Sequence, residues 1–435
     1  MKLRDMLQID FFMLLSAIIL IIFGVLFIYS SNITATGYMA TNEYIRQIIW
    51  GSVGLVLALV LAMLNYGKIY NFSVYIYFIT LIPLMYTSFF GKVIHGTRWL
   101  RIGTLGIQAS EFAKIAVIIL LARYLADTKH SSNGFVRFFV SCIIVLVPMG
   151  IVLVQPDLGT ALVFIPILLC MTFIAGVPPR YLIFMIASLM LTGLLTVLPL
   201  WQSAIMQRSM PLISNLSNFR LIAAIIIVMT AISGIALFGY VKFKKQYFFW
   251  ILYTALIFIF SFGASFAARK MLKNYQIMRL IVFLDPNVDP RGAGWNIIQS
   301  ITAIGSGGLT GRGYLQGTHS HYRYLPEQST DFIFSIFSEE AGFIGGLLIF
   351  TLFMIICLRL LYIMKTTADP FGAYVCAGLA ALYFFHFFIN VGMTMGIMPI
   401  TGIPLHFMSY GGSALITAMI GIGMALSIHI RRFSR

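Results

Sequence analysis

Acidic residues are scarce in this chain, and several of them gather in one place. The sequence contains 13 aspartates and glutamates, and four of them fall within the segment LPEQSTDFIFSIFSEEAG, namely Glu327, Asp331, Glu339 and Glu340. A carboxylate that heads or enters a membrane helix is costly unless it is paired or hydrated, so such a cluster is typical of a functional site. Stabilisation of a helix dipole, or packing alone, is the structural alternative.

The residues around position 331 predict where this carboxylate lies. Ser329 and Thr330 can cap a helix N-terminus, and the apolar run Phe332 to Leu361 is long enough to cross a bilayer. We therefore expect Asp331 on the first turn of a membrane helix, at the membrane surface.

Other polar residues stand beside apolar runs. Glu111 and Lys114 are spaced i, i+3, so they can pair with each other or line a polar pocket. Asp157 lies between two apolar runs, where it serves a site or only caps the second helix. Arg98 and Trp99, taken alone, are typical of a membrane-interface anchor.

The sequence predicts neither a disulfide framework nor a resident metal site. Each of the four cysteines lies in an apolar run without CxxC spacing. His319 and His321 are one residue apart, but two histidines without an assigned carboxylate make a weak metal site. We interpret them as polar loop residues.

Composition places the chain in a membrane. It has 435 residues, of which 60% are hydrophobic and 10% charged, and its mean hydropathy is +0.95. These values exclude a soluble globular protein and indicate an all-α polytopic membrane protein. The net charge of +16 is explained largely by topology signals, so no nucleic-acid partner is predicted.

The apolar runs predict about twelve transmembrane helices in a single integral membrane domain, residues 1–435. With a cytoplasmic N-terminus, every predicted inner loop carries lysine or arginine, as the positive-inside tendency requires. Four polar loops then emerge on the outer face: Thr97 to Ser110, Gln155 to Asp157, Ala268 to Thr330, and Met398 to Gly411.

The outer segment 268–330 is too long for a simple connector. It is rich in glycine and proline turns, which is typical of a lid or binding loop. The bases of the outer loops run against the inside bias, which fits an anionic partner such as a lipid phosphate or pyrophosphate. The alternative is that long loops escape the rule.

Several motifs resemble the SEDS family (shape, elongation, division and sporulation) of membrane glycosyltransferases. They are GTRWLRIG (96–103), SEFAK (110–114), QPDLGT (155–160), LDPNVDPRGAGWNIIQS (284–300), AIGSGGLTGRGYLQGT (303–318), LPEQSTDFIF (325–334) and MPITGIPLHFMSYGGSAL (398–415). The GIPL and LQGT segments are more similar to the rod-elongation members than to the division members.

The resemblance implies roles for individual residues. Asp331 matches the essential aspartate of the family, and a carboxylate base helps a sugar hydroxyl attack by about 10² to 10⁴. The other positions matched to polar or substrate-binding roles are Arg98, Trp99, Glu111, Lys114, Asp157, Arg312, Glu327 and Ser409. Cationic groups, or a divalent cation (Mg or Mn), are expected to stabilise the leaving pyrophosphate.

The sequence departs from the family pattern in two places. Ala109 stands where the family usually has proline. Family members usually have ten spans, whereas residues 202–267 are expected to hold an additional helical pair. An even insertion keeps the large loop 268–330 on the outer side.

The resemblance implies a peptidoglycan glycosyltransferase that polymerises lipid II during cell elongation and maintenance of cell shape. It would be a multi-pass protein of the bacterial cytoplasmic (inner) membrane with an outward-facing active site. The implied partners are lipid II, membrane lipids and a single-pass class B penicillin-binding protein transpeptidase. Two alternatives stay open: a flippase for lipid-linked precursors, and a non-catalytic scaffold for a cell-wall synthase.

Overall fold

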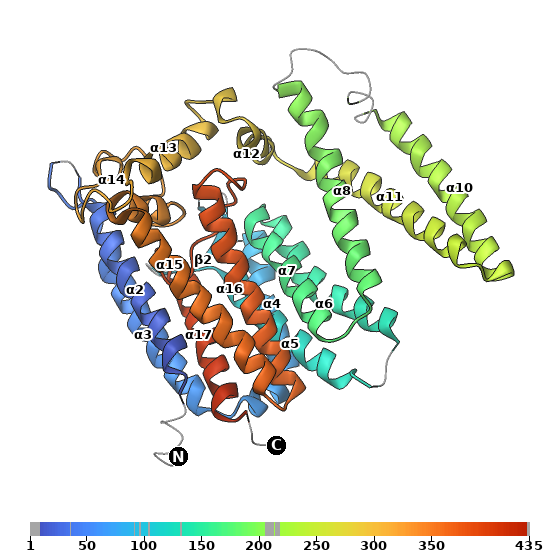
Figure 1. Ribbon diagram of the computed structural model, residues 1–435, viewed down its shortest axis with the longest axis horizontal. Helices are drawn as coiled ribbons and strands as arrows, with labels where there is room; N and C mark the ends of the chain where they lie inside the picture. The colour runs from blue at the N-terminus through green and yellow to red at the C-terminus, as the bar shows by residue number, and fades with distance from the viewer. Residues whose placement is uncertain are drawn as a thin grey trace. The chain divides into compact units, whose positions relative to one another are not determined.

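The computed structural model describes residues 9–34, 36–90, 92–94, 97–102, 105–130, 133–204, 213 and 218–432. Within them the chain is nearly all helical (Figure 1). It forms two compact units, unit 1 (Met1–Val177 and Gln299–Arg435) and unit 2 (Pro178–Ile298).

Unit 1 is a bundle of long helices that run side by side (Figure 1). Its helices are α2 (Phe11–Asn32), α3 (Glu43–Met63), α4 (Tyr66–Phe90), α5 (Ala109–Asp127), α6 (Gly134–Val154), α7 (Leu158–Ile174), the short α14 (Thr318–His321), α15 (Ile333–Thr366), α16 (Pro370–Thr394) and α17 (Gly412–Ile430). In α16 and α17, 72% and 83% of the most apolar stretch is buried, against 28% in α3 and α4. The two C-terminal helices therefore lie at the centre of the bundle, together with α5, most of whose residues are buried.

Unit 2 holds α8 (Pro179–Ala204), α10 (Phe219–Phe243), α11 (Gln246–Met271), α12 (Asn274–Leu284), the 3₁₀ turn η1 (Pro286–Val288) and the start of α13 (Ala293–Ser306). Helix α11 packs against both α8 and α10, and Leu195, Ile222 and Phe262 form their buried contact. The predicted additional pair at 202–267 corresponds to α10 and α11. That this pair is an insertion into the family core stays a prediction.

The segment 268–330, expected to be a large loop, is mostly helical. It contains the end of α11, then α12, η1, α13 and α14. Turn residues separate these short elements: the Asp285 side chain accepts a hydrogen bond from Asn287 N (3.0 Å), and Pro286 begins η1. The glycines and prolines of this segment mark the boundaries of short helices. Because there are so many of them, the helices between them are hard to recognise in the sequence.

A second difference from an all-α fold is a small antiparallel sheet between α4 and α5. Its strands are β1 (Lys92–Ile94), β2 (Thr97–Ile102) and β3 (Leu105–Ile107), in the order β1-β2-β3. Val93 pairs with Arg98, and Leu100 pairs with Ile107. The sequence predicts a loop here, because a hairpin this short has no clear periodicity.

Each of the twelve predicted apolar runs falls on a helix. Among the described residues, ten helices are long and apolar enough to cross a membrane. The other two are α5, which carries Glu111, Lys114, Arg123 and Asp127, and α7, which has 17 residues. A polytopic membrane protein is confirmed, and the number of twelve spans stays a prediction.

One end of unit 1 is held by arginines. Arg137 donates to carbonyl groups at the C-terminal ends of α5 and α7, both at 2.8 Å. Arg431 does the same at the end of α3, and Arg359 pairs with Asp10, the N-cap of α2, at 2.6 Å. Cations at helix C-termini satisfy the last carbonyl groups and complement the helix dipoles.

Helix α15 is interrupted by Gly342, which has φ 66° and ψ −166°. The interruption receives the glycine-rich segment that follows α13: Gly313 N donates to Glu340 O (3.0 Å), and Phe343 N donates to Gly308 O (3.0 Å). A Cβ on Gly311 would overlap Glu340 O, and its φ of +82° also favours glycine. The predicted long helix is thus two helical pieces, and they meet at Gly342, where the glycine-rich segment crosses α15.

Candidate active site

The starts of several helices meet at the end of unit 1 opposite the arginines. Gln108 N, just before α5, donates to Ser413 Oγ on the first turn of α17 (3.0 Å). Tyr410 N, just before α17, donates to Ser329 O ahead of α15 (2.8 Å). Polar segments far apart in the sequence, around residues 108, 329 and 410, therefore form one region.

Asp331 lies in a turn that precedes α15. The Glu327 carbonyl accepts hydrogen bonds from the N–H groups of Thr330, Asp331 and Phe332 (3.2–3.3 Å). Helix α15 begins at Ile333, and Phe332 is its N-cap without a side-chain hydrogen bond. The prediction that Ser329 and Thr330 cap the helix with Asp331 on its first turn is wrong, because the Glu327 carbonyl closes a separate turn. Asp331 is nevertheless half-buried beside the helix start.

Asn390 fixes the backbone of Asp331 from the centre of the bundle. Its amide nitrogen donates to Asp331 O (3.0 Å) and to Ile403 O (2.8 Å), and its side chain is fully buried. One side chain of α16 thereby joins the turn that precedes α15 to the loop that follows α16. Because the Ile403 carbonyl group is buried, losing the donor would leave it without this hydrogen bond.

The predicted pair of Glu111 and Lys114 is confirmed. Lys114 Nζ lies 2.8 Å from Glu111 Oε1 and 2.9 Å from His386 Nε2, on α16. His386 Nδ1 faces Pro404 O at 3.1 Å. Since a carbonyl group can only accept, Nδ1 carries the proton, and the Nε2 lone pair points at the lysine ammonium.

His406 stacks on His386 with ring centroids 3.8 Å apart and an interplanar angle of 21°. Its Nε2 is 3.9 Å from Glu111 Oε2. Burial lowers the pKa of His406, and the neighbouring Glu111 opposes this effect. The four side chains Glu111, Lys114, His386 and His406 form what we call the buried quartet.

Asp157 caps α7, as its position predicts. Its carboxylate accepts from Thr160 N (3.0 Å) and Thr160 Oγ1 (2.8 Å). It also accepts from the side chain of Gln108 (3.1 Å), one turn before Glu111. Burial raises the pKa of Asp157, and the charge of Glu111 adds to the rise. The cap thus lies beside the buried quartet.

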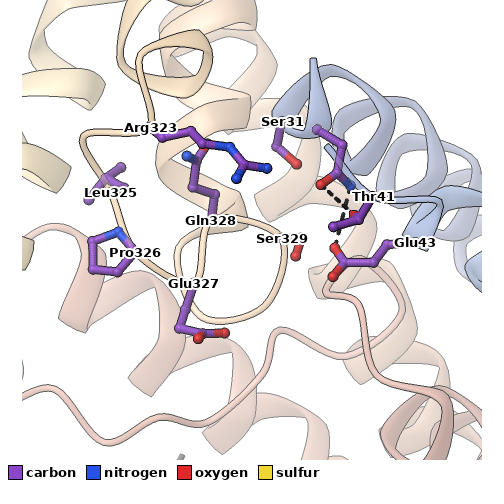
Figure 2. Close-up of a pocket in the computed structure, with 10 residues that line it drawn as sticks. Ser31, Thr41, Glu43, Arg323, Leu325, Pro326, Glu327, Gln328 and Ser329 are labelled. Atoms are coloured by element: carbon purple, nitrogen blue, oxygen red, sulfur yellow. Dashed lines mark hydrogen bonds between the residues drawn. The ribbon is translucent and has the colours of Figure 1, made fainter. Parts of the chain in front are cut away.

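A polar pocket opens next to the Asp331 turn. It has a volume of about 250 Å³ and is lined from the α2–α3 connection and from residues 323–329. Figure 2 shows Arg323, Glu327 and Glu43 on different sides of it. Glu327, predicted to bind substrate, therefore lies at a cavity four residues from Asp331.

Glu339 and Glu340 hold the segment 307–324 against α15. Glu339 Oε1 accepts from the backbone and side chain of both Thr318 and His319 (2.9–3.1 Å). Glu340 accepts from Ser30 Oγ (2.5 Å) and Leu315 N (3.0 Å). Two of the four clustered acids therefore have a structural role, which is to hold this segment against α15.

The remaining predicted residues either lie away from the Asp331 turn or form hydrogen bonds with backbone groups. Arg312 donates to Thr318 Oγ1 (2.7 Å) and is 3.9 Å from Glu339. Ser409 is buried; its Oγ accepts from Leu405 N (2.8 Å), and its carbonyl accepts from Gln47 (3.1 Å). Arg98 and Trp99 lie on β2, and their side chains are outside the described part of the structure.

Three polar residues of the site, His386, Asn390 and His406, were not predicted from the sequence. A signal for the first two was present, because an imidazole and an amide inside the apolar run 373–397 are costly unless they have partners. They are spaced i, i+4 and so share one face of α16. His406 had no such signal, since it lies in a loop.

The described residues contain no group of three or more histidines, cysteines, aspartates or glutamates that could hold a metal ion. That a divalent cation (Mg or Mn) takes part in the reaction stays a prediction.

Comparison with known proteins decides the family. The sequence profile of the cell cycle protein family, FtsW/RodA/SpoVE, matches residues 10–218 and 197–433. The chain belongs to this family. The SEDS resemblance of the motifs is thereby confirmed.

The curated relatives support the rod-elongation type. The chain is 45% identical over 434 residues to the peptidoglycan glycosyltransferase RodA of Treponema pallidum, covering 99% of this chain and 100% of that protein. It is 32% identical over 429 residues to the peptidoglycan glycosyltransferase MrdB of Escherichia coli, covering 98% and 95%. This chain is a glycosyltransferase of the same family, embedded in a membrane by many helices.

Solved structures show that the fold is shared. One chain of a peptidoglycan synthase complex, described as coordinating polymerization and crosslinking, aligns with a TM-score of 0.68 and 23% identity, covering 98% of this chain and 99% of the other. The rod shape determining protein RodA of Thermus thermophilus aligns with a TM-score of 0.60 and 21% identity, covering 98% of each chain.

Proposed function

We propose that this protein polymerises lipid II into glycan strands at the outer face of the bacterial cytoplasmic membrane, during cell elongation and maintenance of cell shape. The observation that carries the proposal is the position of Asp331. It is half-buried, its backbone is fixed by Asn390, and it lies two residues after Ser329, which lines a polar cavity.

In the proposed reaction, the 4-hydroxyl of one sugar attacks the anomeric carbon of another. A new C–O bond forms, the bond from the anomeric carbon to the pyrophosphate oxygen breaks, and the bond electrons leave with the lipid pyrophosphate. The Asp331 carboxylate accepts the hydroxyl proton, which contributes about 10² to 10⁴ to the rate.

The residues predicted to bind substrate divide into two groups. Glu327 lines the cavity, whereas Lys114 is fully buried and engaged by Glu111 and His386. We propose that the buried quartet and Asp157 act indirectly, by fixing the segments around residues 108 and 403–406. Cations at the outer surface, with Arg98 and Arg312 as candidates, would hold the pyrophosphate.

We infer the orientation in the membrane from the arginines at one end of unit 1. At the end opposite Asp331, Arg137 and Arg431 donate to carbonyl groups at helix C-termini, and Arg359 pairs with Asp10, the N-cap of α2. Positive residues favour the cytoplasmic side, so we place Asp331 outside.

A class B penicillin-binding protein transpeptidase is the proposed partner. A chain of similar fold is part of a peptidoglycan synthase complex that coordinates polymerization with crosslinking. Crosslinking is the reaction of a transpeptidase, so a partner of this class would join the strands that the proposed polymerase makes.

The decisive experiment is incubation of the purified protein with labelled lipid II, followed by gel analysis for glycan ladders. Ladders would establish polymerisation. A folded protein that produces none, alone and with the partner transpeptidase, would leave the flippase or scaffold alternative.

Orientation is tested separately with an impermeant maleimide on intact cells. Thr310 and Ala368 are both exposed; Thr310 lies in the segment that crosses α15 at Gly342, and Ala368 follows the C-terminal end of α15. A Thr310→Cys variant should be labelled from outside, and an Ala368→Cys variant only after permeabilisation. The reverse pattern would place Asp331 inside.

A further inference from the structure

The cavity beside Asp331 has a mixture of charges that does not suit a pyrophosphate. Its charged lining residues are one cation, Arg323, and two carboxylates, Glu43 and Glu327. Two carboxylates repel a phosphate group, whereas one cation and two carboxylates match a ligand that carries both a carboxylate and an amine.

The cation of the cavity is available for a ligand. Among the described residues, the Arg323 guanidinium makes no hydrogen bond or ion pair, although it faces the cavity. A guanidinium offers a planar fork that fits a carboxylate with two parallel hydrogen bonds. Arg323 and Glu327 both have left-handed backbone conformations, φ 54° and 52°. Such conformations are strained in non-glycine residues and cluster at ligand sites.

The opposite wall is built to present Glu43. Asn32 receives a hydrogen bond from Thr41 Oγ1 (2.7 Å) and donates to Ile28 O (2.9 Å). The same amide nitrogen donates to Glu43 Oε2 at 3.4 Å. The carboxylate is therefore oriented by a side chain that is itself held in place.

A buried amide also lacks a partner at this site. Gln328 lines the cavity and is 8% exposed, yet its Oε1 has no hydrogen-bond partner among the described residues. A buried acceptor without a donor is destabilising, because it has lost its hydrogen bonds to water. An ammonium or a peptide N–H from a ligand would satisfy it.

We infer that this cavity binds an amino-acid residue whose side chain carries both a carboxylate and a free amine, namely a diamino dicarboxylic acid in the stem peptide of lipid II. The inference rests on the proposed function. At about 250 Å³, the cavity is smaller than the roughly 300–1,000 Å³ of whole-ligand pockets, so it accommodates a branch of the substrate. Its position suits this role, because the stem peptide branches from a sugar that must lie near Asp331.

The test compares two substrates: lipid II, and lipid II whose stem-peptide side-chain amine is N-acetylated. For the unmodified protein, we expect KM to be about tenfold higher with the acetylated substrate, as loss of one charge-assisted contact would give, with kcat unchanged. Equal KM values would overturn the inference. This comparison needs no variant, so it does not depend on the folding of one.

Variants then locate the contact. Glu43→Gln should raise KM for unmodified lipid II about tenfold and remove the discrimination between the two substrates. Arg323→Gln should likewise remove discrimination against lipid II with an amidated carboxylate on the same residue. Arg220→Gln, the same change at an exposed arginine of α10, is the matched control and should behave as the parent.

Failure of the proposed function and failure of the peptide subsite give different results. If the parent protein forms no glycan from either substrate, the proposed function is wrong. If it polymerises both, and Glu43→Gln keeps the parental preference, polymerisation stands and the peptide subsite is wrong.

Discussion

Lys114 Nζ and Glu111 Oε1 are 2.8 Å apart, and the two side chains are 0% and 2% exposed. An ion pair enclosed to this degree is a weak source of net stability, because both ions lose their hydration. Breaking it is costly, since the remaining charge is left buried. The pair is thus a constraint on the start of α5 and on the loop that carries His406.

This constraint gives a stability prediction. Lys114→Met should lower the free energy of unfolding by about 3–5 kcal/mol, because Glu111 is left as an uncompensated buried charge. The double variant Glu111→Gln, Lys114→Met should recover a large part of that loss. Denaturant unfolding in detergent would measure both, and additive losses would show that the two charges are not coupled.

Asp331→Asn should lower the rate of glycan elongation by about 10² or more, because the amide cannot accept the hydroxyl proton. Its melting temperature should match that of the parent, since Asp331 is half-buried in a turn held by backbone hydrogen bonds. Parental ladders from a well-folded variant would remove Asp331 from the chemistry and leave Glu327 or Asp157 as candidates.

Asn390→Leu should reduce kcat for polymerisation by about 10-fold to 100-fold, because the carbonyl groups of Asp331 and Ile403 lose their donor. The matched control is Thr394→Val, one turn further along α16, whose hydroxyl bonds only within its own helix in the described contacts. The prediction fails if both variants keep parental kcat, or if both lose activity equally.

Glu339→Ala should release the segment 307–324. This carboxylate oxygen accepts hydrogen bonds from both Thr318 and His319, and its loss leaves those donors unpaired. Trypsin should then cut after Arg312 and Arg323 at least about tenfold faster than in the parent. Glu339→Gln keeps an acceptor oxygen and serves as the control. Equal cleavage rates for Glu339→Ala and the parent would show that Glu339 does not hold this segment in place.

The pKa of His406 predicts a pH dependence. Burial holds it below the ordinary value of about 6.5, so the unfolded chain binds more protons between the two values. The stability it contributes is present above pH 6.5 and is lost as the pH falls through the folded pKa. His406→Phe keeps a stacked ring and should flatten this slope in melting temperatures measured between pH 5 and 8. If the slope of melting temperature against pH is unchanged in this variant, other titratable groups cause the pH dependence.

Local patterns in the sequence were sufficient for much of this protein. Runs of apolar residues predicted the helices, and i, i+3 spacing predicted the pair of Glu111 and Lys114, because both depend on neighbours within a few residues. Asp157 was predicted as a cap for the same reason. The family motifs, which are contiguous in the chain, predicted the enzyme class.

Only the tertiary structure decided which polar residues act together. Glu339 and Glu327 belong to the same acidic window, yet one is sealed under a glycine-rich segment and the other lines a cavity. Glu43 and Arg323 face one cavity from 280 positions apart in the chain. Such contacts depend on how helices pack and where a backbone crosses at Gly342, and no local periodicity encodes that choice.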